Sequence, residues 1–190
     1  MTESLMDVKA TRALEGLAAA LGELLMGTGL RVATAESCTG GWIAQTITSV
    51  AGSSEWFDRG FVTYSNDAKR QMLGVRAQTL GKHGAVSEKV VKDMALGAIK
   101  KSNAEFAVSV SGIAGPGGGT DDKPVGTVWF AWAHGSDVEA SMMRFPGNRQ
   151  QVRQGAVMIA LQGLISRIPA WLKNEEKSYA DIGESKSLVQ

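Results

Sequence analysis

The run Ala-Glu-Ser-Cys-Thr-Gly-Gly at positions 35–41 holds residue types that attack electrophiles and bind anions. A hydroxyl and a thiol stand there between a short apolar run and two glycines, and a helical pattern resumes at Trp42. The first N–H groups of a helix have no intrahelical acceptor and can bind a phosphate or an oxyanion. Ser37 is therefore a candidate nucleophile, with candidate donors from Thr39 to Gly41. The same pattern also fits a Ser37 or Thr39 side chain that only caps the helix.

A serine nucleophile needs a base, and neither His83 nor His134 stands beside an informative motif. Lys69 follows Thr-Tyr-Ser-Asn-Asp-Ala at a predicted change from strand to helix, where the carboxyl ends of strands gather ligands. A lysine acts as a general base once burial or neighbouring cations lower its pKa. Lys69 is thus a candidate base, and Tyr64 a candidate proton relay or hydroxyl anchor. A solvated helix charge is the simpler alternative for Lys69.

Cys38 is the rival nucleophile, because a helix N-terminus lowers the pKa of a thiol. No base stands visibly near it in the sequence, and small buried cysteines are common, so a structural role is the preferred interpretation. As the only cysteine of the chain, it excludes an intrachain disulfide. With only two histidines beside it, we expect no Cys/His zinc site and no bound metal.

A second glycine-rich run, Gly112–Thr120, follows a predicted buried strand. It departs from the dinucleotide fingerprint because Thr120 stands where a third glycine is needed, and no Gly-Lys-Ser/Thr follows for a P-loop. The glycines at 112, 115 and 117 instead allow the backbone to approach a ligand or another chain closely.

Two arginines stand near the start of the last predicted helix. Arg149 and Arg153 are four residues apart and so share one helix face. The planar guanidinium suits a phosphate or a carboxylate, so both are candidate anion binders. Pattern alone favours two solvated surface charges.

Composition restricts the partners of the chain. Its 190 residues carry 20 Lys plus Arg against 19 Asp plus Glu, a net charge of +1, which argues against a nucleic-acid or membrane partner. The first nine residues lack a signal-peptide core, and the apolar helical stretch 14–26 is shorter than the ~20 residues of a membrane span. We therefore expect a cytoplasmic protein. Glycine, at 23 residues, is the one surplus.

Hydrophobic periodicity predicts the elements that must position these residues. Helices are expected at 14–26, 42–50, 66–73, 88–101 and 148–168, the last ended by Pro169, and strands at 30–36, 60–65, 106–111, 125–133 and 138–145. Segment 75–80 is ambiguous. The two last strands form a hairpin through 134–137, which demands an antiparallel pair.

This alternation predicts a three-layer α/β/α sandwich with a mixed, mostly parallel sheet. No linker divides the chain, so we expect one domain over 1–190, with a core at about 10–172 and a polar, frayed tail at 173–190. Trp129 and Trp132 lie on one predicted strand, and their large apolar side chains would pack either in the core or against a second copy of the chain. A homo-oligomer is expected, with a dimer as the preferred form.

Six motifs occur in order, and together they resemble the CinA C-terminal domain family, the nicotinamide-nucleotide amidases. The resemblance covers about residues 14–172, nearly the whole chain. One departure is Ser111, where a threonine is the more usual residue; it keeps a hydroxyl. The motifs are Ala35-Glu-Ser-Cys-Thr-Gly-Gly41, Gly60-x-x-Thr-Tyr-Ser-Asn-x-x-Lys69, Gly84-Ala-Val-Ser-Glu88, Gly112-Ile-Ala-Gly-Pro-Gly-Gly, Lys123-Pro-Val-Gly-Thr127 and Arg149-x-x-x-Arg153.

The resemblance implies hydrolysis of the carboxamide of nicotinamide mononucleotide to nicotinate mononucleotide and ammonia, in pyridine nucleotide salvage. It implies a Ser–Lys mechanism on Ser37 and Lys69, with Tyr64 nearby and no cofactor. We expect the substrate to contact the turn at Cys38, Thr39, Gly40 and Gly41, the second glycine loop at Gly112, Gly115 and Gly117, and either Arg149 or Arg153 at its phosphate.

Two other classes remain open from the sequence. The same loops and arginines would serve a non-catalytic nucleotide-binding or regulatory module, in which Lys69 need not lose its proton. The third class is a partner-interaction domain linked to DNA uptake or repair, which the name of the larger proteins of the resembled family implies. The near-zero net charge argues against direct DNA binding by such a domain.

Overall fold

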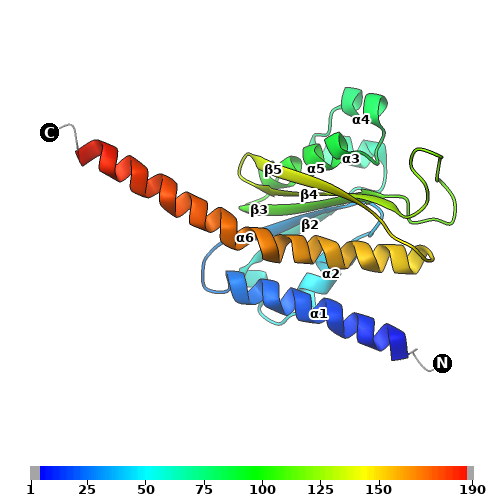
Figure 1. Ribbon diagram of the computed structural model, residues 1–190, viewed down its shortest axis with the longest axis horizontal. Coiled ribbons are helices and arrows are strands. Elements are labelled where there is room, and N and C mark those ends of the chain that lie inside the picture. Colours follow the sequence, from blue (N-terminus) through cyan, green and yellow to red (C-terminus); the bar gives the residue numbers. More distant parts are fainter. Residues whose placement is uncertain (1–4, 188–190) are drawn as a thin grey trace.

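The computed structural model describes residues 5–187, with side chains from 8 to 174, and has one sheet between two layers of helices (Figure 1). The strand order is β2-β1-β3-β4-β5. β1 pairs in parallel with β2 and β3, whereas β4 pairs antiparallel with β3 and β5, so β4 alone runs against the other strands of this sheet. The expected mixed, mostly parallel sheet is confirmed. The strands are β1 (Val32–Glu36), β2 (Phe57–Val62), β3 (Phe106–Gly112), β4 (Thr127–His134) and β5 (Asp137–Arg144).

Helices cover both faces of this sheet. One layer holds α1 (Leu5–Leu25), α2 (Trp42–Thr48) and the long α6 (Arg149–Ser187), with the short 3₁₀ helix η1 (Ser53–Glu55) beside α2. The other layer holds α3 (Asn66–Leu73), α4 (Ala77–His83) and α5 (Glu88–Lys100). The three-layer α/β/α sandwich expected from the sequence is therefore confirmed.

Alternation along the strands builds the two halves of the core. On β3, Phe106, Val108 and Val110 pack with α1, α2 and α6, while Ala107 faces the layer of α3 to α5. Successive side chains of a strand point to opposite faces, so a strand buried on both faces is mostly apolar. This explains why apolar residues dominate β3, with Ser109 and Ser111 as its buried hydroxyls.

The carboxyl ends of three strands meet at one edge of the sheet. Glu36, the last residue of β1, pairs with Val62 at the end of β2 and with Val110 near the end of β3. The N–H of Ser37 then donates to the carbonyl of Val110 at 3.0 Å, and the N–H of Thr63 donates to the carbonyl of Glu36 at 2.7 Å. These bonds hold the segments after β1 and β2 next to each other.

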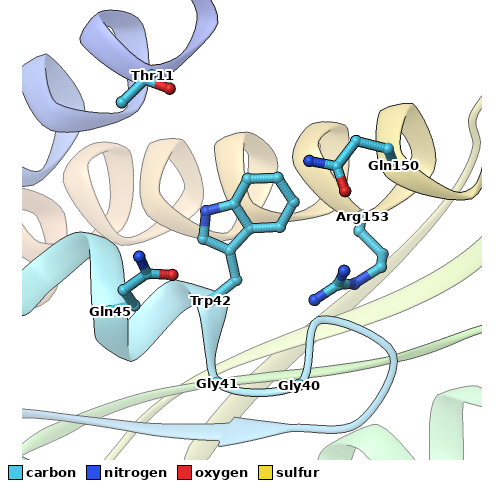
Figure 2. A pocket seen from close by; sticks show the side chains of 7 residues that line it. All are labelled: Thr11, Gly40, Gly41, Trp42, Gln45, Gln150 and Arg153. Atoms are coloured by element: carbon cyan, nitrogen blue, oxygen red, sulfur yellow. The ribbon is translucent and has the colours of Figure 1, made fainter. Parts of the chain in front are cut away.

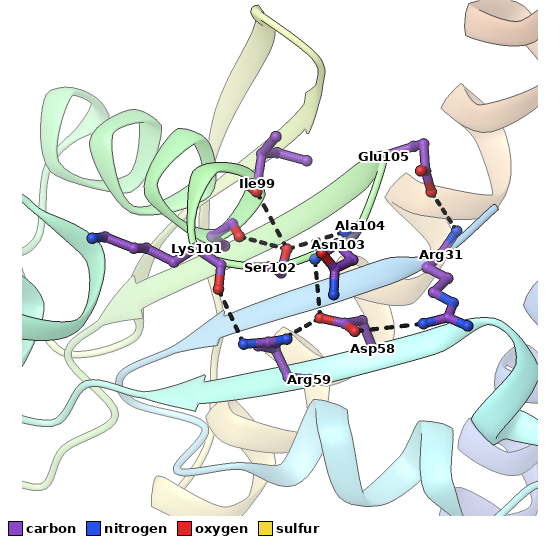
Figure 3. Close-up of polar contacts among 10 residues, drawn as sticks. Arg31, Asp58, Arg59, Ile99, Lys101, Ser102, Asn103, Ala104 and Glu105 are labelled. Atoms are coloured by element: carbon purple, nitrogen blue, oxygen red, sulfur yellow. Dashed lines mark hydrogen bonds and ion pairs between the residues drawn. The ribbon is translucent and has the colours of Figure 1, made fainter.

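The opposite end of the sheet is held by a polar cluster around Asp58 (Figure 3). Its carboxylate accepts from Arg59 Nε at 2.6 Å and from the N–H of Asn103 at 3.2 Å, and Arg31 Nη1 lies 3.8 Å away. Desolvation acts to raise the pKa of Asp58, but these donors and the two guanidinium charges outweigh it and lower the pKa. The cluster ties β2 to the loop before β3, away from the candidate site.

Helix α6 corrects the helix end predicted at Pro169. The helix continues through Pro169 to Ser187. An interior proline removes one helical hydrogen bond. Ile168 and Trp171 are buried on either side of it, so packing outweighs that loss. By length and composition, Arg149–Asn174 is the single membrane-span candidate among the described residues, but Val157 and Leu164 place this stretch in the core, against the sheet.

Smaller differences concern boundaries. The strand expected at 60–65 lies at Phe57–Val62, because Ser65 leaves the sheet to cap α3 by accepting from the N–H of Ala68. The first helix begins at Leu5 rather than 14, and the ambiguous segment 75–80 forms most of α4.

Candidate active site

Lys69 and Ser37 meet at the carboxyl edge of the sheet. The Nζ of Lys69 lies 3.0 Å from the Oγ of Ser37 and 2.7 Å from the carbonyl oxygen of Thr63. Lys69 comes from the first turns of α3, and Ser37 follows β1 directly, so the parallel pairing of β1 with β2 delivers both. The arrangement is that of a nucleophile and a base within hydrogen-bond reach.

The surroundings of Lys69 favour its neutral form. The side chain is 1% exposed, and the described residues include no carboxylate paired with it. Burial lowers the pKa of Lys69, and only a negative charge on Cys38 would act to raise it. Burial also raises the pKa of Cys38, to about 12, so this thiol is uncharged near neutral pH. The alternative of a solvated helix charge for Lys69 is therefore wrong.

The same numbers bear on Cys38 as the rival nucleophile. A thiol with a pKa of about 12 has a negligible thiolate fraction near neutral pH, and the thiolate is the reactive form. Its side chain is buried in the core cluster beside α2 and α6. Cys38 therefore contributes packing and backbone atoms here.

Glu36 organises the turn that follows Ser37. Its buried carboxylate accepts from the N–H groups of Gly41 and Ile43 at 3.0 Å each and of Ala44 at 2.9 Å, and from the Thr34 hydroxyl at 3.3 Å. The carboxylate thus fills the anion site at the start of α2 from within the chain.

The turn therefore leaves fewer free donors than the sequence indicated. The N–H of Gly41 is used by Glu36, and that of Gly40 donates to the Ser37 carbonyl at 3.0 Å. Among the described residues, the N–H groups of Cys38 and Thr39 donate to no acceptor on another residue. The expectation that Gly40 and Gly41 provide free oxyanion donors is therefore wrong. The N–H groups of Cys38 and Thr39, next to Ser37, remain as candidate donors. Gly40 and Gly41 both have positive φ, 65° and 93°, which glycine adopts without strain.

Arg153 lies on the carbonyl side of this turn. Its Nε donates to the Cys38 carbonyl at 3.1 Å and its Nη2 to the Thr39 carbonyl at 2.8 Å. Its guanidinium carbon is 5.2 Å from the centre of the Trp42 ring. Figure 2 shows Arg153 reaching from α6 toward Gly40 and Trp42.

Arg149 contacts different residues from Arg153. Its Nη2 donates to the Tyr64 hydroxyl at 2.7 Å and its Nη1 to the Gly115 carbonyl at 3.0 Å. Arg149 therefore links the segment before α3 to the second glycine loop. Tyr64 is 61% exposed, and it makes no hydrogen bond to Ser37 or Lys69 among those of the described residues.

The second glycine loop borders the same edge. A Cβ at Gly112 would meet the Thr127 carbonyl oxygen at 2.9 Å, so this glycine allows close pairing with β4, and Gly117 has open space around it. The Nζ of Lys123 donates to the His83 carbonyl at 2.9 Å, which ties the loop to the end of α4.

A cavity of about 660 Å³ adjoins the turn on the side of α1, α2 and α6 (Figure 2). Its lining does not include Ser37 or Lys69. No group of three His, Cys, Asp or Glu side chains in the described part of the chain could hold a metal ion. The cavity is lined by Thr11, Gly40, Gly41, Trp42, Gln45, Gln150 and Arg153.

Two residues of the site were missed by the sequence reasoning. Glu36 was noticed only as part of a motif, although an acidic residue closing a buried apolar run is itself a signal of a satisfied internal carboxylate. The Thr63 carbonyl, which accepts from Lys69, carries no side-chain signal because any residue could provide it.

Comparisons with known proteins agree on one family. The model of the CinA C-terminal domain matches residues 14–168. The chain is 58% identical over 145 residues to the nicotinamide-nucleotide amidohydrolase PncC of Escherichia coli K12, covering 76% of this chain and 88% of that protein. The PncC protein of Pseudomonas putida is 54% identical over 149 residues, 78% and 93% of the two chains. The crystal structure of the competence/damage inducible protein CihA from Agrobacterium tumefaciens has a TM-score of 0.79 at 49% identity, covering 81% and 94%.

Proposed function

The chain belongs to the CinA C-terminal domain family, and from that premise we propose that it hydrolyses the carboxamide of nicotinamide mononucleotide, giving nicotinate mononucleotide and ammonia. The enzyme class is that of its PncC relatives. The observation that carries the proposed mechanism is the 3.0 Å contact between Lys69 Nζ and Ser37 Oγ in a buried site.

In the first step, the uncharged amine of Lys69 keeps one N–H on the Thr63 carbonyl and accepts the proton of Ser37 Oγ. The Oγ–C bond forms at the carboxamide carbon, and the carbonyl electrons move to oxygen. The N–H groups of Cys38 and Thr39 bind this oxyanion. Donors of this kind contribute about 3 kcal/mol each to the transition state.

In the second step the intermediate collapses and the C–N bond breaks. The ammonium of Lys69 returns its proton to the leaving nitrogen, and ammonia departs. Water then attacks the Ser37 ester and gives a proton to Lys69, which passes it to Ser37 Oγ as the ester C–O bond breaks. Both side chains are restored, and the acid product loses its proton to solvent as a carboxylate. The scheme uses no metal and no cofactor.

The phosphate of the nucleotide is assigned to Arg149 in preference to Arg153. Arg149 is exposed and links Tyr64 to Gly115, so it stands where the segment before α3 faces the glycine loop. Both arginines have two donors engaged, but Arg153 is only partly exposed and both of its bonds go to backbone carbonyls of the turn. Tyr64 then acts through Arg149 and the substrate rather than in the proton relay expected from the sequence.

The same proposal includes the metabolic role, the compartment and the assembly of the protein. The released product would return pyridine nucleotide to cofactor synthesis in the cytoplasm. A homodimer is the expected assembly, testable by light scattering, and no nucleic-acid partner is expected from the charge. One domain serves the whole reaction.

The test is ammonia and nicotinate mononucleotide release by the purified chain, with nicotinamide and nicotinamide riboside as controls. Turnover of the nucleotide is expected, with much lower rates for both controls. Tight binding of the nucleotide without turnover would support the alternative of a non-catalytic regulatory module. Strongly salt-dependent DNA binding without turnover would favour a role in DNA uptake or repair.

A further inference from the structure

Arg153 holds the carbonyl side of the two peptide units that follow Cys38 and Thr39. Its bonds, at 3.1 Å and 2.8 Å, join α6 to a turn more than a hundred residues earlier in the chain. Hydrogen bonds from a charged donor are about twice as strong as neutral ones. The turn is therefore held by a charged fork from a core helix as well as by the carboxylate of Glu36.

Peptide geometry links this fork to the other side of the turn. In a planar trans peptide the C=O of one residue and the N–H of the next point in opposite directions. The carbonyl of Cys38 and the N–H of Thr39 belong to one such unit. Arg153 thus pulls electron density toward the Cys38 oxygen, which makes the Thr39 N–H a stronger donor.

The position of the guanidinium is itself fixed. Its carbon lies 5.2 Å from the centre of the Trp42 ring, within the range of a cation–π contact. Trp42 begins α2, the helix whose amino end Glu36 fills. The stacking and the two carbonyl bonds hold the guanidinium of Arg153 on the turn.

We propose that Arg153 is a positioning residue that orients and polarises the Cys38–Thr39 peptide, so that the Thr39 N–H binds the oxyanion, and that it does not bind the substrate phosphate. The inference rests on the proposed function, because it assigns a role within the proposed amidase step. It separates two arginines that the sequence left competing for one task.

The first experiment compares Arg153→Gln and Arg153→Lys with the unaltered chain in steady-state kinetics on nicotinamide mononucleotide. Arg153→Gln is expected to lower kcat about tenfold, less than the 10²–10³-fold loss on removing a donor outright, with KM unchanged. Arg153→Lys keeps the positive charge but cannot bond both carbonyls with one planar guanidinium. Its kcat should lie between those of the unaltered chain and Arg153→Gln. Arg167→Gln is the matched control, since Arg167 also lies over a tryptophan, 4.2 Å from the Trp132 ring, on the same helix.

The second experiment measures ground-state binding without turnover. In a Ser37→Ala background, adding Arg153→Gln should leave the Kd of nicotinamide mononucleotide within about twofold. A tenfold weaker Kd, or a raised KM with kcat unchanged, would assign Arg153 to the phosphate and overturn the inference. A kcat equal to that of the unaltered chain would overturn it as well.

The third experiment is independent of activity. Replacing Arg153 by Gln should move the ¹⁵N resonance of the Thr39 amide by more than that of Cys38, whose preceding carbonyl bonds to Gly40 instead. Equal shifts at both amides would contradict polarisation of the Cys38–Thr39 peptide. If the unaltered chain releases no ammonia, the proposed function fails, whereas the resonances still report whether Arg153 polarises this peptide.

Discussion

The amine of Lys69 donates to the hydroxyl of Ser37 over 3.0 Å, and 32 residues of chain separate the two. Ser37 follows β1 and Lys69 lies in α3 just after β2, so the pairing of two parallel strands sets the distance. The sheet thereby fixes the Ser37 hydroxyl against a buried amine, as the proposed mechanism requires.

Removing either member of this pair should abolish turnover. Ser37→Ala and Lys69→Ala are each expected to lower kcat at least about thousandfold, because the nucleophile or its base is lost. Ammonia release by folded variants, checked by circular dichroism, measures this. Cys38→Ala should retain activity; if it is inactive while Ser37→Ala is active, the roles of the two residues are reversed.

The activity should rise with pH through the pKa of Lys69. Burial lowers this pKa from 10.5, and the amine must be neutral to accept the serine proton. A profile of kcat/KM against pH is expected to have an ascending limb that begins below the ordinary lysine range. Cys38→Ala should leave the ascending limb at the same pH. If the limb moves in this variant, the titrating group is the Cys38 thiol and not the Lys69 amine.

Stability should depend on pH through the same group. The folded pKa of Lys69 is lower than the unfolded one, so between the two values the unfolded chain binds more protons. The free energy of unfolding therefore rises with pH toward about 10.5, as the cost of burying a charged amine disappears. The test measures the urea unfolding midpoint against pH for the unaltered chain and for Lys69→Met, which lacks this contribution. If the midpoint depends on pH equally in both proteins, Lys69 is not a buried titrating group.

Glu36→Gln should impair both folding and catalysis. The replacement keeps the shape but presents an NH₂ group to backbone donors now bound by a carboxylate. A loss of about 2–4 kcal/mol in unfolding free energy is expected from a buried hydrogen-bond network. Chemical denaturation measures the loss, and a kcat that falls in the folded fraction would show that the turn itself has moved.

Gly97→Ala should destabilise the layer that carries Lys69. A Cβ at Gly97 would overlap the carbonyl oxygen of Leu73 at the end of α3, so α5 and α3 would have to separate. A cost of about 1–3 kcal/mol is typical of such overpacking. Gly16→Ala, in α1 with nothing within 4 Å, should instead stabilise by about 0.5–1 kcal/mol. The melting temperatures of the two variants are compared with that of the unaltered chain. An unchanged melting temperature for Gly97→Ala would show that α3 and α5 can move apart without cost.

The sequence predicted the layers well because short, mostly apolar strands alternate with segments of helical periodicity. It also brought Ser37 and Lys69 forward as candidates, since each follows a strand. It could not separate Arg149 from Arg153, because helical spacing puts both on one face and only the turn decides which carbonyls they meet. Pro169 misled the prediction of α6, because the burial of Ile168 and Trp171 depends on distant elements.

Glu36 has a consequence for how the proposed reaction ends. The substrate presents a neutral carboxamide to the turn, and hydrolysis turns that group into a carboxylate. The turn already surrounds one internal carboxylate, held by the donors of α2. Two like charges in a poorly solvated site repel each other. In the proposed reaction, the carboxylate that shapes this turn would therefore also favour departure of the acid product and weaken its competition with fresh substrate.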